Sequence, residues 1–362
     1  MQIIHDRRAL HRIPELELQL PKTAEYLRNS LSGLKCRVFS PMESALCAWF
    51  DFGKASAIAF RADMDGLPIR EQTGADYTST HPGRMHACGH DGHMAILLEL
   101  ARRLDQKKDL PHNVLLIFQP GEESPGGARL LCQTGVLEQY GVCAVFGLHL
   151  WPGLPAGEVF SREGGMMSRS CEINVELFGR SAHIGKAREG IDALAAGLEF
   201  YRRAVAMEQL LPENVSRLLK FGKMESGTVR NAVSAYTRIE GSLRAFEDSV
   251  FFALRSGLDE IARDVARETG CTVTVTGSEG YPAVWNPTEL FRRVSQAVPF
   301  HRAAEPSMTT EDFSWYQQQV PGLFFWLGTG DTPALHSVNF DFDESILTKG
   351  ADFFEALAEN LL

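Results

Sequence analysis

The stretch Asn113-Val114-Leu115-Leu116-Ile117-Phe118 is an almost wholly apolar run of strand length. A strand that is apolar on both faces is typical of a parallel sheet covered by helices on both sides. Working outward, residues 142–150 form a second such run, and the apolar residues of 91–104 fall largely on one face of a helix. This alternation predicts an α/β domain with a central sheet flanked by helices.

A different pattern begins near residue 168. Residues 171–178 alternate apolar and polar side chains, which predicts a strand with one face exposed to water. From there to residue 280 the expected order is strand, helix, strand, strand, helix, strand, which is that of a ferredoxin-like α+β unit. We therefore expect a domain of residues 168–280, inserted into a first domain made of residues 1–167 and 281–362.

The composition excludes several classes of protein. The 362 residues are 44% hydrophobic and 23% charged, which argues against a disordered chain. No apolar run approaches the roughly 20 residues of a membrane span, and the N-terminus lacks the apolar segment of a signal peptide, so a cytoplasmic protein is expected. The net charge of -10 argues against a nucleic-acid partner. Seven scattered cysteines do not form the pattern of a disulfide framework.

A dense group of metal-binding residue types lies in His86-Ala87-Cys88-Gly89-His90-Asp91-Gly92-His93, just before the predicted helix. Thiolate and imidazole are the ligands of zinc and of its first-row neighbours. Cys88 and His90 are two residues apart, so both side chains can face the same way in an extended turn. The group predicts a metal site. The alternative is a polar turn in which Asp91 caps the helix.

Further candidate residues follow predicted strands. Glu122 and Glu123 come after the first apolar run, where one carboxylate could bind metal and the other transfer a proton. His149 ends the second run, and Asp63 follows another apolar run, where it could orient a ligand imidazole. His336 lies after a glycine-rich turn. The alternatives to a metal site are that Glu122 and Glu123 lie in an exposed acidic loop and that His149 and His336 are ordinary core or loop histidines.

Other hydrolytic chemistries have weaker support in the sequence. The chain contains no G-x-S-x-G, phosphate-binding loop or dinucleotide-binding motif. Cys88 beside histidines could be a cysteine nucleophile. That alternative leaves Glu122, Glu123 and His149 without a role, whereas a metal site uses them all.

The chain resembles the aminoacylase and carboxypeptidase family of dinuclear metallopeptidases, peptidase family M20, and within it the amidohydrolase branch. That branch contains aminoacylases, hippurate hydrolases, auxin-conjugate hydrolases and N-acetyldiaminopimelate deacetylases. The resemblance covers nearly the whole chain and is carried by residues 11–15, 61–68, 86–93, 119–123, 147–149 and 308–313. It implies a metallopeptidase-type catalytic domain with an inserted lid and dimerisation domain, which hydrolyses the amide bond of an N-acyl amino acid, in particular an N-acetyl one.

The resemblance also implies a metal centre. It would hold two divalent ions per subunit, Zn, Mn, Co or Ni, through Cys88, His90, Glu123, His149 and His336. Cys88 would bridge the ions, where the wider family has an aspartate. Arg61 stands where the wider family has a ligand histidine, and His90 would replace that ligand. Glu122 matches the general base, and Asp63 keeps the orienting position.

In the lid, the resemblance assigns roles to three more residues. His183 matches a histidine that reaches the active site of the partner subunit in a homodimer, and Asn231 and Arg244 match positions that contact substrate. Residues 227–243 and 308–328 look most like those of N-acetyldiaminopimelate deacetylases, which is one specific alternative. Another is a catalytically weak paralogue that binds metal or ligand, although the presence of Glu122 argues against it.

Overall fold

The protein consists of two compact units in a computed structural model that describes residues 1–361. Unit 1 contains Met1–Met166, Val284–Pro306 and the chain from Glu311 onward, and unit 2 contains Met167–Ala283 and Ser307–Thr310. The sequence expectation had placed Met167 and residues 281–283 and 307–310 in the first domain. Residues 307–310 contact unit 2 at several points: the Ser168 hydroxyl donates to the Met308 carbonyl at 2.9 Å, and Met167 forms a β-bridge with Ser307.

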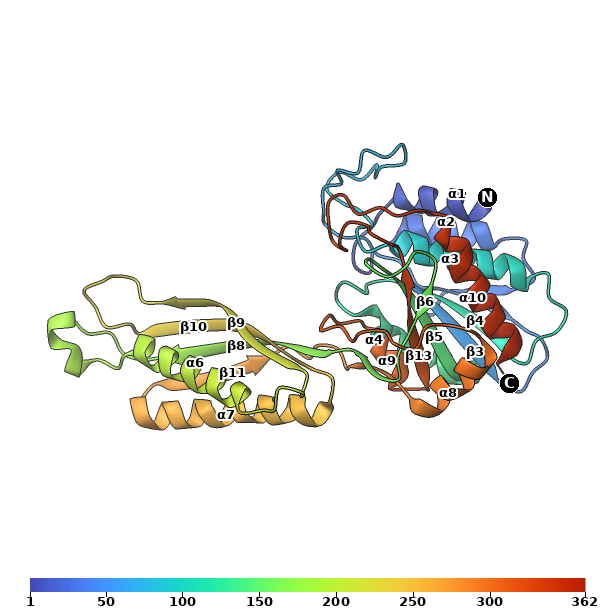
Figure 1. Cartoon of the computed structure of the whole chain (residues 1–362). Coiled ribbons are helices and arrows are strands. Elements are labelled where there is room, and N and C mark those ends of the chain that lie inside the picture. The colour runs from blue at the N-terminus through green and yellow to red at the C-terminus, as the bar shows by residue number, and fades with distance from the viewer. Residues whose placement is uncertain (362) are drawn as a thin grey trace. The chain divides into compact units, whose positions relative to one another are not determined.

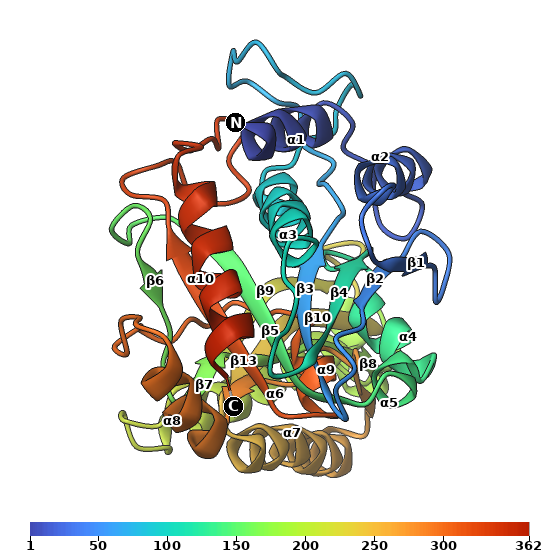
Figure 2. The same ribbon diagram turned by 90° about the vertical axis from the view of Figure 1, so that its right-hand side faces the viewer.

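Unit 1 is built on a mixed seven-stranded sheet (Figure 2). Its strands, in spatial order, are β1 (Arg37–Phe39), β2 (Leu46–Phe50), β4 (Asn113–Gln119), β3 (Ala57–Asp63), β5 (Val142–Trp151), β13 (Gly322–Gly328) and β6 (Val159–Phe160). The four central strands β4, β3, β5 and β13 are parallel. All residues of β3, β4 and β13 are buried, as the apolar run at 113–118 predicts. The expected α/β fold with a central sheet is confirmed.

Helices cover both faces of this sheet. Helices α1 (Gln2–His11), α3 (His90–Leu104) and α10 (Ile346–Asn360) pack against one another on one face, and α4 (Gly127–Gln133) and α9 (Ser314–Gln317) lie on the other (Figures 1 and 2). The remaining elements of unit 1 are α2 (Pro21–Leu31), α5 (Val136–Gln139) and α8 (Thr288–Ala297). A small sheet pairs β12 (Val284–Asn286) with β7 (Gly164–Met167), whose last residue belongs to unit 2.

The start of α3 differs from the sequence expectation. The alternative interpretation of this segment made Asp91 the N-cap, but the helix begins at His90, and its N-cap is Gly89 with a φ of 84°. Asp91 therefore lies inside the first turn, where its carboxylate accepts hydrogen bonds from Arg7 Nε and His11 Nδ1, both at 2.8 Å. Asp91 does not cap the helix, because the left-handed glycine starts the helix before the carboxylate is reached.

Unit 2 is an antiparallel four-stranded sheet with the order β11-β8-β10-β9. Its strands and helices are β8 (Arg169–Phe178), the 3-10 helix η1 (Ile184–Glu189), α6 (Ala193–Gln209), β9 (Arg217–Ser226), β10 (Tyr236–Ala245), α7 (Asp248–Thr269) and β11 (Thr272–Gly277). Apolar residues of both long helices and of the sheet form one core, which includes Phe200, Val175 and Leu258. The element order is that of a ferredoxin-like unit.

The packing of Phe60 in β3 predicts that the stability of unit 1 is sensitive to substitution of this residue. Its buried ring lies 5.6 Å from the ring of Phe146 in β5 and 4.8 Å from that of Phe354 in α10, measured between centroids. We expect Phe60→Ala to lower the free energy of unfolding of unit 1 by about 3–5 kcal/mol, because it leaves a cavity where sheet and helix meet. Chemical denaturation followed by circular dichroism measures this loss.

The matched variant is Phe60→Leu, which keeps an apolar side chain at the same position. We expect it to lose less than about 1.5 kcal/mol. Equal losses in the two variants, or a loss below about 1 kcal/mol for Phe60→Ala, would show that the three rings do not hold the sheet against α10.

Candidate metal centre

The candidate residues of unit 1 gather where its parallel strands end. Asp63 is the last residue of β3, Gln119 is the last residue of β4, and His149 lies two residues before the end of β5. In open α/β sheets, ligand sites lie at the carboxyl ends of the parallel strands. The fold thus brings together residues that are far apart in the sequence.

The turn into α3 presents Cys88 and His90 to this edge. Between them, Gly89 has a φ of 84°, a backbone conformation that residues other than glycine rarely adopt. A Cβ atom at Gly89 would also come within 2.9 Å of the side chain of Leu150. Both Cys88 and His90 are buried. The requirement for glycine explains why the motif has this residue between its thiol and its imidazole.

The five expected metal ligands converge in one cluster. Ligand atoms of Cys88, His90 and His149 all lie within 4.8 Å of one another, and so do those of Cys88, Glu123 and His336. Within these groups, Cys88 Sγ is 3.4 Å from His149 Nε2, and His336 Nε2 is 3.1 Å from a carboxylate oxygen of Glu123. The thiol of Cys88 belongs to both groups, so it occupies the place from which a ligand could bridge two cations.

The donor atoms of this cluster fit a divalent cation. His90 Nε2 is buried and has no hydrogen-bond partner among the described residues, which is costly unless the atom has another ligand. Burial alone lowers the pKa of His90, but the nearby carboxylates of Asp63 and Asp65 raise it to about 10. An environment that stabilises positive charge on this ring also favours a cation beside it. A thiol with three imidazoles is a soft donor set, suited to zinc and its neighbours.

The pKa values of the two neighbouring glutamates are shifted in opposite directions. Burial, together with the carboxylates of Glu311 and Glu123, holds the pKa of Glu122 well above its usual range. Burial also raises the pKa of Glu123, but the hydrogen bond to His336 and the charge of His90 outweigh it and lower that pKa. Glu123 is thus suited to bind a cation and Glu122 to exchange a proton, which is how environment divides roles between paired carboxylates.

The two remaining histidines of the cluster are His149, whose protonation state suits a metal ligand, and His336, whose backbone conformation is unusual. Burial and the nearby ring of His93 lower the pKa of His149, which keeps its imidazole neutral and its lone pair available. His336 has a φ of 64°, and its backbone N–H donates to the carbonyl of Ala87 at 2.8 Å. A left-handed conformation in a residue other than glycine is strained, and such strain is concentrated at functional sites.

A buried guanidinium lies beneath the cluster. Arg61 donates to a carboxylate oxygen of Asp63 at 2.7 Å, to one of Asp312 at 2.6 Å and to the side-chain oxygen of Gln119 at 2.8 Å. The other oxygen of Asp63 accepts from His93 Nδ1 at 2.6 Å. Asp63 therefore orients His93 directly, and its oxygen is 3.8 Å from His90 Nδ1.

Some residues that shape the site were not singled out from the sequence. Asp65 accepts a hydrogen bond from His90 Nδ1 at its backbone carbonyl, at 2.8 Å, and His93 and Asp312 surround Asp63 and Arg61. The only signal for Asp65 was its place two residues after Asp63 on the same chain segment. Asp312 follows Arg61 by 251 residues, so no local pattern could connect them.

Three further candidates, His183, Asn231 and Arg244, belong to unit 2. His183 is exposed, and its Nδ1 accepts the backbone N–H of Gly185 at 3.1 Å, so a neutral ring carries its proton on Nε2. Asn231 is exposed and accepts the N–H of Ile184 through its backbone carbonyl. Arg244 is half-buried, and its Nη1 donates to the carbonyl of Met308 at 2.6 Å.

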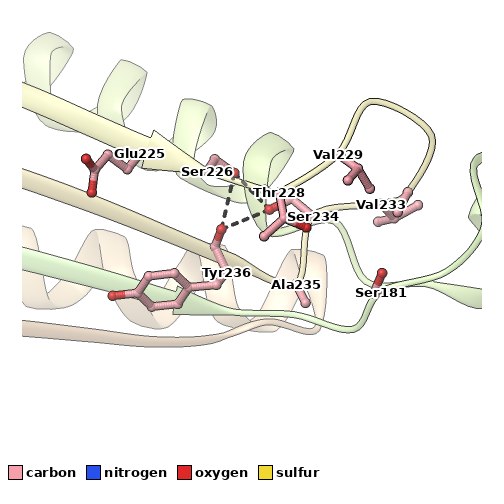
Figure 3. A pocket seen from close by; sticks show the side chains of 11 residues that line it. Ser181, Glu225, Ser226, Thr228, Val229, Val233, Ser234, Ala235 and Tyr236 are labelled. Carbon is pink, nitrogen blue, oxygen red and sulfur yellow. Dashed lines mark hydrogen bonds between the residues drawn. The ribbon is translucent and has the colours of Figure 1, made fainter.

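His183 lies beside a pocket of unit 2. It forms a β-bridge with Ala232, which lines an open pocket of about 670 Å³ together with residues of 225–229 and 233–236 (Figure 3). The hydroxyls of Ser226 and Ser234 hydrogen-bond to each other at 2.8 Å in its wall. Asn231 and Ala232 are consecutive, so two of the three candidates of unit 2 are next to this pocket.

Known proteins of similar sequence and structure were identified. Residues 59–360 match the model of peptidase family M20/M25/M40. The chain is 34% identical to an N-acetyldiaminopimelate deacetylase of Limosilactobacillus reuteri, over 99% of this chain and 97% of that protein. It is 32% identical to one from Shouchella clausii, over 92% and 91%. A solved Bacillus subtilis protein, described as a dinuclear metal-binding peptidase of the M20 family, has a TM-score of 0.87 and 31% identity, over 99% and 96% of the chains.

None of the helices in residues 1–361 combines the length and the apolar character that crossing a membrane requires. The family model covers most of the chain, and the relatives above 30% identity cover nearly all of it. The resemblance expected from the sequence motifs is therefore confirmed, and the chain belongs to peptidase family M20/M25/M40.

Proposed function

We propose that this metallo-amidohydrolase removes the acyl group from a small N-acyl amino acid, with Glu122 as the general base. The observation that carries the proposal is the convergence of one thiol, three imidazoles and one carboxylate beside the buried Glu122. The names of the relatives in Limosilactobacillus and Shouchella make N-acetyldiaminopimelate the first substrate to test.

We assign two divalent cations to the ligands Cys88, His90, Glu123, His149 and His336. Two cations are proposed because Cys88 is shared between two ligand groups. Zn, Mn, Co or Ni would suit the donor atoms. When bound, such cations lower the pKa of a coordinated water from about 15.7 toward 7 and polarise the acyl oxygen.

The residues of the chain would then perform the proton transfers. A carboxylate oxygen of Glu122 takes a proton from the attacking water and later gives it to the nitrogen of the leaving amine. The raised pKa of Glu122 brings this group closer to the pH at which it must both accept and release a proton. Asp63 and Asp65 hold the imidazoles of His93 and His90 in place during these steps.

Unit 2 would act as the lid and the dimerisation domain. Leu194, Leu198 and Tyr201 are exposed by 43%, 53% and 43% and recur at helical spacing along α6. An apolar stripe of this kind fits a second copy of the chain. In the dimer, Nε2–H of His183 would donate to the oxyanion in the partner's active site, and Asn231 and Arg244 would contact the substrate. The hydrogen bond to Gly185 leaves that Nε2–H free to point outward.

The alternative of a cysteine hydrolase is disfavoured by the surroundings of Cys88. Burial and the carboxylates of Glu123 and Glu122 hold the pKa of this thiol well above its usual range. A nucleophilic cysteine requires the opposite shift. A binding paralogue without catalytic activity is disfavoured because it would have no use for a buried base beside the ligands.

The first prediction concerns the cations and the substrate. We expect a chelator to abolish hydrolysis, and Zn, Mn, Co or Ni to restore it, because the donor set requires a bound cation. The measurement is the release of free amine from a panel of N-acetyl and N-benzoyl amino acids that includes N-acetyldiaminopimelate. Activity that survives complete removal of metal would favour the cysteine mechanism, and no turnover of any panel member would favour the binding paralogue.

The second prediction concerns the general base. We expect Glu122→Gln to bind metal as the wild type does but to lose about 10²- to 10⁴-fold in kcat, because the amide cannot take the proton of the water. Metal content by mass spectrometry and steady-state kinetics measure both effects. If the variant kept a tenth of the wild-type activity, Glu122 would not be the base.

The third prediction concerns the partner subunit. We expect both His183→Ala and Glu122→Gln homodimers to be inactive, while a purified heterodimer of the two recovers about half of the wild-type rate, since one of its two sites is complete. The control is a heterodimer of His183→Ala with the double variant, which has no His183 at all. Failure of the first heterodimer to exceed this control would exclude a contribution of His183 across the dimer.

A further inference from the structure

We propose that Asp65 is a positioning residue, whose carboxylate fixes the backbone of Glu122 and Glu123 and whose carbonyl fixes the ring of His90. This proposal rests on the proposed function, in which Glu122 is the base and the other two are ligands. Asp65 itself would touch neither cation nor substrate. It would act by fixing the backbone positions of Glu122 and Glu123 and the ring orientation of His90.

The geometry around Asp65 carries this inference. Its side chain is buried, and its two carboxylate oxygens accept from two consecutive backbone amides, Glu122 N–H at 2.9 Å and Glu123 N–H at 3.0 Å. Its backbone carbonyl accepts from His90 Nδ1 at 2.8 Å. One residue is therefore hydrogen-bonded to the loop after β4 and to the first residue of α3.

The segment that carries Asp65 is itself anchored on both sides. Before it, Asp63 ends β3 in the middle of the sheet. After it, Leu67 exchanges backbone hydrogen bonds with Met85 at 2.8 and 3.0 Å. Gly66 donates to the carbonyl of Glu15 at 2.7 Å, and a Cβ atom on Gly66 would come within 2.8 Å of Pro14. The carboxylate thus projects from a backbone that has little freedom to move.

The loop after β4 that carries Glu122 and Glu123, here called the glutamate loop, needs an anchor more than a strand does, because a strand is held by its neighbours in the sheet. It leaves β4 through Gly121, which has a φ of 71°, and no strand ladder supports the two glutamates that follow. A carboxylate bonded to both amides removes the rotation that would swing Glu122 and Glu123 apart or toward solvent. Hydrogen bonds to a charged acceptor are stronger than neutral ones, so a buried aspartate is well suited to this task.

The chemistry of a carboxylate makes the inference testable with an isosteric change. Asparagine offers one acceptor oxygen, and its other terminal atom is a donor. In Asp65→Asn one backbone amide would therefore face an NH₂ group instead of an acceptor, while the shape of the side chain and the carbonyl bond to His90 remain. The change removes one acceptor from the glutamate loop and keeps the carbonyl bond to His90. It also removes the charge of a carboxylate whose oxygen lies 3.7 Å from His90 Nδ1, so amide exchange at 119–124 is the readout specific to the loop.

The experiment compares Asp65→Asn with Asp6→Asn in the full-length protein. Asp6 is a matched control because it is also buried in unit 1 and also accepts two strong hydrogen bonds, from Tyr26 at 2.8 Å and Arg102 at 2.7 Å. The readouts are hydrogen exchange of peptides that cover residues 119–124, with and without cobalt, the affinity for Co²⁺ from its thiolate charge-transfer band, and kcat with KM.

We expect Asp65→Asn to raise the exchange of the 119–124 amides at least about tenfold in both states and to weaken Co²⁺ binding about 10- to 100-fold. With saturating metal, kcat should fall about 10- to 100-fold and KM should stay within about threefold, since the base is displaced and the substrate contacts are not. Asp6→Asn should change none of these values by more than about twofold, even where it lowers the melting temperature.

Two outcomes overturn the proposal. One is an Asp65→Asn protein whose exchange at 119–124 matches that of Asp6→Asn, and the other is unchanged Co²⁺ affinity. Failure of the proposed function looks different, because the wild type would then bind Co²⁺ and hydrolyse no member of the substrate panel. In that case exchange and Co²⁺ affinity still decide the role of Asp65.

Discussion

The buried guanidinium of Arg61 is the interaction on which the arrangement of the site depends. Carboxylates of Asp63, Asp312 and Glu311 lie within 3.1 Å of its nitrogens, all of them buried. So many acids gathered in a water-poor region would repel one another strongly without a cation. Removing one partner from a buried ion pair typically costs about 3–5 kcal/mol, because the other charge is left uncompensated. Arg61 therefore allows the ends of β3 and β4 and the 311–312 segment to meet.

The positive charge of Arg61 belongs to the chain itself, whereas the positive charge of a bound divalent cation would be exchangeable. Asp63 and Asp312 accept hydrogen bonds from the positive charge of Arg61, whereas the ligand atom of Glu123 lies with those of Cys88 and His336. The resemblance to the wider family implies a ligand histidine at the position of Arg61. With arginine there, this chain has a fixed charge in the place of a ligand, and His90 from the start of α3 lies in the cluster instead.

Much of the fold and the placement of the site could be predicted from the sequence because both rest on local patterns. The apolar run at 113–118 indicated a buried strand, and such strands end at a common edge, so the residues after them were expected to meet. Contacts that join distant segments could not be predicted in this way. The pairing of Arg61 with Asp312 spans 251 residues, and the three hydrogen bonds of Asp65 depend on how two loops approach each other. Residue types alone left open the alternative in which Asp91 caps α3, because the start of the helix depends on the backbone conformation of Gly89.

The positions of the hydrogen-bond donors suggest what the proposed lid would add to the site, namely a donor to the oxyanion. Hydrolysis of an amide develops negative charge on the acyl oxygen, and a well-placed donor is worth about 2.7–4 kcal/mol there. In the described metal cluster the acids are acceptors, and the donors of Arg61 are already bonded to Asp63, Asp312 and Gln119. The imidazole of His183, by contrast, is exposed, and its Nδ1 is bonded to Gly185, so its remaining N–H is free to donate. If unit 2 supplies this donor from a partner subunit, the base and the oxyanion donor lie on different chains. Turnover would then require a dimer, and metal binding would not.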